Sequence, residues 1–407
     1  MRKLPLLFVL LLFIISSCIE EYNSAVSQNA SFKPELVIQW RIQAGGETII
    51  YLTHTQPLSC EETVDSIFNA KISVVGENGY ESSLAEYDIE NNCYVIDTRE
   101  LPANASYSLK VNLDGETYQS EYMNVLESPA IDTLTYKEHN NESFRGISLH
   151  VSAHNKNDAS RYYLWTYEED WEFHAPIDII GIGGGVLVYD KTFYKFSEAN
   201  IYNHYLYCWK HNTSANIHIY DTSLLDENIV NDVELFRIPN DDIRISYIYS
   251  VLVKQLCLDE KAYSYYRTLE KQAEESSGLF TPMPIEIKGN VFCTSNPNIN
   301  VKGYVLASSV SYKRLFIYES DFKDIHSEYE GDCIILTPDE TQPSWPEYWG
   351  TLVDKFGAVA LTANGNFYPY NNPDYMNNKL YQRECIDCRS VKGSTKKRPD
   401  FWPNNHE

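Results

Sequence analysis

The sequence has little that would span a membrane or perform chemistry through a familiar motif. Its longest apolar run, Leu4 to Ile15, has about a dozen residues, whereas a transmembrane helix needs about 20. It contains no His-Glu-x-x-His, no Gly-x-Ser-x-Gly and no Walker sequence. Basic residues are also few: 33 Lys and Arg stand against 57 Asp and Glu, for a formal net charge of -24. Because nucleic acid and anionic headgroups would repel such a chain, we expect no nucleic-acid partner. Because no catalytic motif is present, we also expect no cofactor and no enzymatic activity.

The N-terminal residues are typical of a lipoprotein signal. Two basic residues precede the apolar run, and two serines precede Cys18. This pattern predicts cleavage before Cys18 and acylation of its thiol, with palmitate among the acyl chains. We expect a signal peptide over 1–17, a flexible polar tether over 18–34 and membrane attachment through lipid alone. Glu20 and Glu21 resemble the surface-export signal of some Gram-negative lipoproteins; the alternative is a solvated tether on a periplasm-facing protein.

Cysteine is the one scarce residue whose number is informative. Besides Cys18 there are eight cysteines, and an even number in an exported chain favours disulfides. Eight cysteines allow about 105 connectivities, so the sequence does not choose among them. Cys60 and Cys93 are the only pair in the N-terminal third, and we predict a bridge between them by locality. The candidate disulfide residues are Cys60, Cys93, Cys208, Cys257, Cys293, Cys333, Cys385 and Cys388.

The Cys385-x-x-Cys388 unit invites two functional interpretations, and the sequence disfavours both. A zinc ribbon needs a second close cysteine pair, and the chain has none. A thioredoxin-type motif needs a following helix, whereas the next residues are rich in Gly, Lys and Pro. We expect structural disulfides to distant partners such as Cys208 or Cys333, which would hold the C-terminal tail on the second domain.

Many short alternating segments separated by turn residues predict a mainly β fold. The clearest is a hairpin, in which apolar alternation leads into Asp114-Gly115, a dipeptide preferred in two-residue type I′ turns. A two-residue loop pairs Val111 with Tyr118. The same register places Tyr107 opposite Tyr122.

The pattern of turns and strands predicts three structural regions. We expect an immunoglobulin-like β-sandwich over 35–128, a second β-rich sandwich or open barrel over 129–330, and an irregular cysteine-containing region over 331–407 packed on the second domain. The strand Val301 to Ala307 falls in the second of these. One inserted helix is expected near 259–276, with Asp259 as N-cap and an apolar stripe that covers the sheet core. The stripe consists of Ala262, Tyr266, Leu269 and Ala273.

Two sets of residues suggest metal ligands, and a structural interpretation is preferred for each. His204, Cys208, His211 and His218 lie in a segment of strand formers, where His204 and Cys208 would stand about 13 Å apart. We expect no metal there. The acidic runs Glu168 to Asp170 and Asn240 to Asp242 are interpreted as solvated loops, with calcium as the alternative.

Several ordered motifs resemble a known family. They are Leu258-Asp259-Glu260-Lys261-Ala262-Tyr263, Gly278-Leu279-Phe280, Gly289-Asn290-Val291, Gly303-Tyr304, Cys385-Ile386-Asp387-Cys388-Arg389 and Pro399-Asp400-Phe401-Trp402. Together they resemble the domain-of-unknown-function family numbered 4249, lipoproteins of Gram-negative bacteria. The resemblance implies an outer-membrane lipoprotein often associated with a TonB-dependent transporter, and it brings no established enzymatic activity. One departure is Lys392-Gly393, where the family often has Gly-Gly.

These observations give one functional hypothesis and two alternatives. The hypothesis is a non-catalytic accessory or ligand-binding partner of a TonB-dependent transporter, displayed on the outer membrane, with a glycan or peptide as possible ligand. The alternatives are an envelope hydrolase acting on glycan or peptide and a structural envelope protein without ligand. Arg389, Lys396, Lys397 and Arg398 form a local basic patch on an acidic chain. It is either a docking surface for acidic transporter loops or anionic glycans, or a solvated tail pinned by cysteines.

Overall fold

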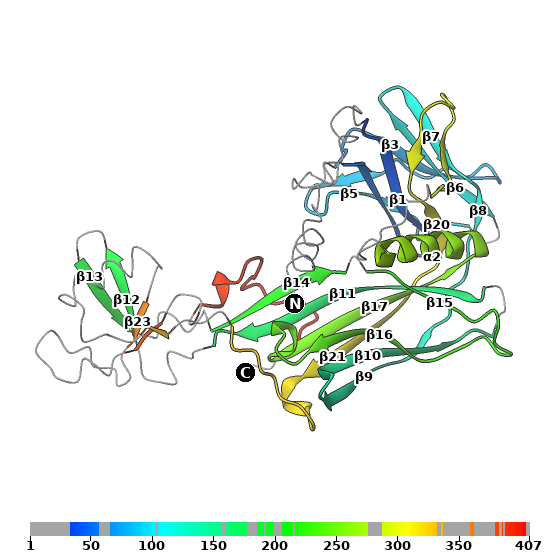
Figure 1. Ribbon diagram of the computed structural model, residues 1–407. Coiled ribbons are helices and arrows are strands. Elements are labelled where there is room, and N and C mark those ends of the chain that lie inside the picture. Colours follow the sequence, from blue (N-terminus) through cyan, green and yellow to red (C-terminus); the bar gives the residue numbers. More distant parts are fainter. Residues whose placement is uncertain are drawn as a thin grey trace, which may run out of the picture.

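The computed structural model shows two β bodies with one helix between them and a smaller group of strands to one side (Figure 1). It describes residues 33–56, 66–102, 105–156, 160–176, 185–190, 193–198, 206–214, 216–275, 287–331, 335–336, 359–361, 379–381, 385 and 387–403. The chain is mainly β, which confirms the predicted class. Cys18 and the predicted signal and tether lie outside the described residues.

The first body packs two sheets around one apolar core. One sheet has the order β19-β1-β2-β5-β4, with β20 also on β1. Its strands are β1 (Leu36–Gln43), β2 (Glu47–His54), β4 (Glu86–Asp88), β5 (Cys93–Asp97), β19 (Val301–Lys302) and β20 (Val305–Ser308). The other sheet has the order β18-β7-β6-β3, with β8 on β6. Its strands are β3 (Lys71–Gly76), β6 (Ser106–Leu113), β7 (Glu116–Ser120), β8 (Met123–Asn124) and β18 (Val291–Cys293). Alternate residues such as Ile38, Ile50 and Val74 face inward and are fully buried, because side chains alternate between strand faces.

Three strands of this first body come from far along the chain, which corrects the expected boundary. β19 and β20 pair in parallel with β1, and β18 pairs with β7. The Val301 to Ala307 segment therefore belongs to the first body and not to the second. Parallel pairing across such a distance leaves no local turn signal, so the apolar run identified the strand but not its sheet.

Gly303 and Asn290, both from the motifs that resemble the family, allow β18, β19 and β20 to pack in the first body. Gly303 has a φ of 103°, and a Cβ there would lie 2.0 Å from the carbonyl oxygen of Ile38. Asn290 donates from Nδ2 to the carbonyl oxygen of Val305 and accepts from the Val305 amide, both at 2.8 Å. These two residues hold β20 beside β1 and connect it to the segment that leads into β18.

The hairpin prediction is correct at its turn and wrong further along. Asp114 and Gly115 have φ angles of 51° and 86°, as a type I′ turn requires, and Val111 pairs with Tyr118. Tyr107, however, pairs with Met123 in β8 and not with Tyr122. The register shifts by one residue after β7 ends, so the turn chemistry governs only the nearest pairs.

The second body consists of a three-stranded and a five-stranded sheet. The first has the order β16-β10-β9, with strands β9 (Ile131–Asn141), β10 (Phe144–His154) and β16 (Ile229–Pro239). The second has the order β14-β11-β17-β21, with β15 on β11. Its strands are β11 (Tyr162–His174), β14 (Tyr207–Thr213), β15 (His218–Asp221), β17 (Ile248–Leu258) and β21 (Ser311–Tyr318). Leu149, Trp165 and Val251 are fully buried in one shared core. Short 3-10 turns follow at η3 (Ile243–Ile245), η4 (Glu319–Asp321) and η6 (Cys388–Ser390).

The predicted helix is α2 (Glu260–Glu275), and it lies in the joint between the two bodies (Figure 1). Asp259 Oδ1 accepts a hydrogen bond of 2.7 Å from the Ala262 amide, which confirms the N-cap. Ala262 and Tyr266 are buried in a cluster with residues of β11, β17 and β20. Their stripe therefore covers the sheet of the second body and also contacts the first. In the described part of the chain, no helix has the length and apolarity needed to cross a membrane.

A separate group of strands lies to one side of both bodies (Figure 1). β12 (Gly185–Asp190) pairs with β13 (Phe193–Glu198), and a second sheet has the order β22-β24-β23. The latter strands are β22 (Ile335–Leu336), β23 (Val359–Leu361) and β24 (Lys379–Tyr381). The region over 331–407 therefore contains strands as well as the irregular tail that was predicted.

Candidate functional site

The C-terminal segment 387–403, which we name the tail clasp, is bonded to the five-stranded sheet at three points, two on the edge strand β14 and one on the adjacent β11. Cys388 is bonded to Cys208 of β14, with a Cα–Cα distance of 5.6 Å. Thr395 and Trp209 exchange two backbone hydrogen bonds, each of 2.8 Å. Trp402 is buried, and its Nε1 donates to Glu172 Oε2 at 2.9 Å. The expectation that Cys388 bridges to a distant partner such as Cys208 is confirmed.

The tail clasp covers both faces of β14 as well as its edge. Cys208 and Trp209 are neighbours on a strand, so their side chains point to opposite faces. Cys388 joins the core between the two sheets, whereas Trp402 packs with Trp209 on the other face. A bare edge strand presents unpaired backbone groups to other chains. The clasp blocks part of that edge and holds its own backbone in a fixed position.

The predicted basic patch divides into bonded and exposed residues. Arg389 donates from Nε and Nη2 to the carboxylate of Asp387, at 2.9 and 2.8 Å. Lys396 donates to the carbonyl oxygen of Tyr207, and its ammonium lies 4.3 Å from that ring's centroid. Burial, followed by the charge of Arg389, lowers the pKa of Lys396. Lys392, Lys397 and Arg398 are exposed, and we name these three residues the basic face.

The acidic run on β11 is not the solvated loop that the sequence suggested. Glu169 is only 2% exposed, and its Oε1 accepts from Arg244 Nη1 and from the Tyr249 hydroxyl, both at 2.7 Å. Asp242, from the other acidic run, also bonds Arg244. Burial lowers the pKa of Arg244, but the hydrogen bond to Asp242 and the charge of Glu169 outweigh it and raise that pKa. Both runs thus contribute to one partly buried ion-pair network around Arg244.

The remaining carboxylates of β11 are also held by specific partners. Asp170 accepts from His211 Nδ1 at 2.7 Å and from Arg314 Nη1 at 3.1 Å. The guanidinium of Arg314 in turn stacks on Phe401 of the tail clasp, 3.7 Å from the ring centroid. These contacts connect the tail clasp with the charged groups of the sheet, and the arrangement is structural in character.

The four residues considered as metal ligands are not brought together. Cys208 is in a disulfide, His211 is paired with Asp170, and His218 packs on the ring of Tyr167. His204 lies outside the described residues. Within the described ranges, no group of three or more His, Cys, Asp or Glu is placed to hold a metal ion.

The predicted Cys60–Cys93 bridge is wrong, because Cys93 carries a free thiol. Cys93 begins β5 and is buried, where desolvation raises its pKa. Cys257 and Cys293 are free and buried as well, and burial raises the pKa of Cys257 to about 11. Cys385 is disulfide-bonded, whereas Cys60 and Cys333 lie outside the described residues. Proximity in sequence was a poor guide, since the observed bridge spans 180 residues.

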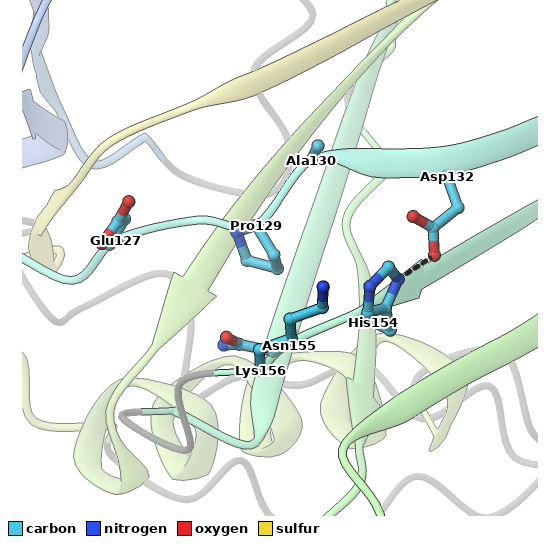
Figure 2. A pocket seen from close by; sticks show the side chains of 7 residues that line it. All are labelled: Glu127, Pro129, Ala130, Asp132, His154, Asn155 and Lys156. Carbon is cyan, nitrogen blue, oxygen red and sulfur yellow. Dashed lines mark hydrogen bonds and ion pairs between the residues drawn. The ribbon is translucent and has the colours of Figure 1, made fainter.

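A pocket of about 300 Å³ lies where the linker between the two bodies meets the end of β10 (Figure 2). It is lined by Glu127, Pro129, Ala130, Asp132, His154, Asn155 and Lys156. Asp132 Oδ2 and His154 Nδ1 are 2.6 Å apart. No sequence motif marks this site, because its residues come from two separate segments, 127–132 and 154–156, and Asp132 is placed by an irregularity in β9.

These features define a mainly β protein with a disulfide-locked tail, and the comparisons give its family. The model of the family described as "Domain of unknown function (DUF4249)" matches residues 19–314, so the chain belongs to this family. No curated protein matches. Among solved structures, a cryo-EM reconstruction of native E. coli alpha-2-macroglobulin is 8% identical with a TM-score of 0.16. That match covers 57% of this chain and only 14% of the other, and we draw nothing from it.

Proposed function

We propose that this protein is a lipid-anchored, non-catalytic accessory of a TonB-dependent outer-membrane transporter, and that it docks through the basic face of the tail clasp. The observation that carries this proposal is the exposure of Lys392, Lys397 and Arg398 on a locked segment of a chain with net charge -24. The segment is anchored at Cys388, Thr395 and Trp402, so docking would require little further ordering of the backbone.

Charge explains why such a surface would be selective. Opposite charges across an interface raise association rates and disfavour wrong partners. The basic face offers three cations on a protein that otherwise repels acidic surfaces. Acidic extracellular loops of a transporter are the complementary partner, and anionic glycans share the same chemistry.

A charge-reversal triple variant tests the docking surface. Lys392→Glu, Lys397→Glu and Arg398→Glu should reduce recovery of the β-barrel transporter, in affinity purification from solubilised outer membranes, by about tenfold or more. Lys396 is left unchanged because it bonds the Tyr207 carbonyl. The control is Lys71→Glu, Lys271→Glu and Lys323→Glu, which changes the net charge equally at exposed lysines elsewhere. Equal transporter recovery from the two triple variants would contradict docking through the basic face.

The anchor is tested separately from docking. Cys18→Ala should abolish acylation and release the protein from membranes, because the proposed attachment is through lipid alone. Membrane association that survives this substitution would contradict the lipid anchor.

Surface display has its own test. Protease added to intact cells should digest the wild-type protein if it is displayed on the surface. Digestion that begins only after lysis would place it on the periplasmic side.

A further inference from the structure

The pocket in Figure 2 is formed by a β-bulge that redirects one carboxylate. In the ladder between β9 and β10, Ser152 pairs with Thr133, whereas the next residue, Ala153, pairs with Ile131. Asp132 is therefore the extra residue of a bulge. Bulges turn side chains away from their regular direction, and here the Asp132 carboxylate meets His154 at 2.6 Å.

A lysine from β21 fixes the backbone of this bulge. Lys313 Nζ donates to the carbonyl oxygen of Ile131 at 3.3 Å and to that of Asp132 at 2.5 Å. The two carbonyl groups on either side of the irregular peptide thus have a charged partner. This contact holds the Asp132 carboxylate in place and makes the bulge a stable feature of the sheet.

Asp132 in turn sets the orientation of the imidazole. An ionised carboxylate only accepts hydrogen bonds, so His154 Nδ1 carries the proton and donates it. The ring's other nitrogen, Nε2, then faces the pocket. Figure 2 shows this nitrogen on the side of the ring toward which the Lys156 amine reaches, beneath Pro129 and Ala130. With the proton on Nδ1, Nε2 carries a lone pair and accepts, so Lys156 offers a ligand a cation and His154 offers it an acceptor.

The opposite wall of the pocket is rigid and carries an acid. Ser128 Oγ donates to the carbonyl oxygen of Gln255 at 2.9 Å, and Gln255 Nε2 donates to that of Pro129 at 2.7 Å. These bonds fix the linker that supplies Glu127. Neither Glu127 nor Lys156 has a hydrogen-bond or ion-pair partner within the described residues, so both charges are available.

We propose that this pocket binds a small zwitterionic molecule of the amino-acid or dipeptide class. Lys156 takes its carboxylate, Glu127 takes its ammonium group, and His154 Nε2 accepts a hydrogen bond from one of its N–H groups. The pocket contains two acids beside Lys156, so a simple anion would meet Glu127 and Asp132, and a simple cation would meet Lys156. A ligand that carries both charges can pair with Lys156 and with Glu127. The volume of about 300 Å³ suits such a molecule and is at the small end for ligand sites. This site is independent of the basic face and of transporter docking.

NMR titration of the full mature chain with glycylglycine tests the proposal. We expect shifts at His154 and the backbone around Lys156, with acetate, methylammonium and inorganic phosphate each binding about tenfold more weakly or worse. Lys156→Gln should weaken glycylglycine binding by about tenfold, whereas Lys71→Gln, at an exposed site on the first body, should leave it unchanged. Phosphate or acetate binding as tightly as glycylglycine would overturn the zwitterion assignment. Absence of His154 shifts at millimolar glycylglycine, or equal weakening by both variants, would overturn the site.

The role of Asp132 has its own readout. Asp132→Ala should change the ¹⁵N chemical shifts of the His154 ring, because the Nδ1–H tautomer loses its acceptor. It should also weaken glycylglycine binding. Unchanged ring shifts in a folded variant would show that the bulge does not orient the imidazole, and would contradict the proposed arrangement.

Discussion

Glu169 is a buried carboxylate whose charge is balanced by Arg244, and this pair predicts a large mutational effect. Arg244→Met leaves the carboxylate without its cation, and we expect a loss of about 3 kcal/mol in the free energy of unfolding, measured by urea denaturation. The double variant Arg244→Met with Glu169→Gln should recover part of that loss, because the amide removes the buried charge and still accepts from the Tyr249 hydroxyl. A single-variant cost below about 1 kcal/mol would contradict the importance of the pair.

His211 gives a pH dependence whose direction follows from its partner. The hydrogen bond to Asp170 raises the pKa of His211 above its usual 6.5 and outweighs the opposing effect of burial. A raised folded-state pKa means that the stabilisation is fully present below 6.5 and is lost as the pH rises through the folded value.

Thermal unfolding of the wild type and His211→Gln checks this prediction. The wild type should exceed the variant in Tm most at about pH 6 and least at about pH 8.5. The difference should correspond to less than about 1 kcal/mol, since the imidazole is 55% exposed and solvent screens the pair. A gap that widens toward high pH would reverse the assigned sign.

Single residues were predictable where their role is local. Asp259 precedes an apolar stripe, and Asp114-Gly115 sits between alternating segments, so capping and turn chemistry identified both. Cys93 and Glu169 were misjudged because their environments depend on distant chain segments. Asp132 was missed for a different reason: a bulge adds one residue to a strand without leaving a sequence signal as strong as a turn.

At the level of elements, the parallel pairing of β19 and β20 with β1 depends on Gly303. An alanine there would place its Cβ 2.0 Å from the Ile38 carbonyl oxygen, so the strands must separate. We expect Gly303→Ala to lower the free energy of unfolding by more than about 2 kcal/mol in urea denaturation. Gly79→Ala is the matched control, because Gly79 also has a positive φ of 84° but nothing lies within 4 Å. It should cost about 1 kcal/mol. Equal costs for the two variants would show that the close approach is not limiting.

The strands themselves were largely predictable, and their assembly was not. The alternating run before Asp114-Gly115 located β6, and the Val301 to Ala307 run located β19 and β20. The return of β18 to β20 to the first body follows from contacts between segments far apart in sequence. Periodicity reports which residues are buried, but it does not report which strand lies beside them.

For the molecule as a whole, the Cys208–Cys388 bond links the tail clasp to the sheet across 180 residues of chain. Closing so long a loop restricts the unfolded state, and Cys388→Ser should lower the free energy of unfolding by about 3–5 kcal/mol. Cys293→Ser is the control, because Cys293 is a buried free thiol near Ser295 and Glu116. Its cost should be about 1 kcal/mol.

Limited proteolysis and hydrogen exchange report whether the Cys388→Ser variant loosens the tail clasp. Cys388→Ser should expose the chain near Gly393 to protease and increase exchange at the Trp209 amide, whose acceptor is the Thr395 carbonyl. Loss of that cover also frees the β14 edge, so the variant should self-associate more readily than Cys293→Ser.

If the basic face docks only when the tail is locked, transporter recovery should fall in Cys388→Ser even though Lys392, Lys397 and Arg398 are intact. Undiminished recovery from a variant with a protease-sensitive tail would show that docking does not require the clasp.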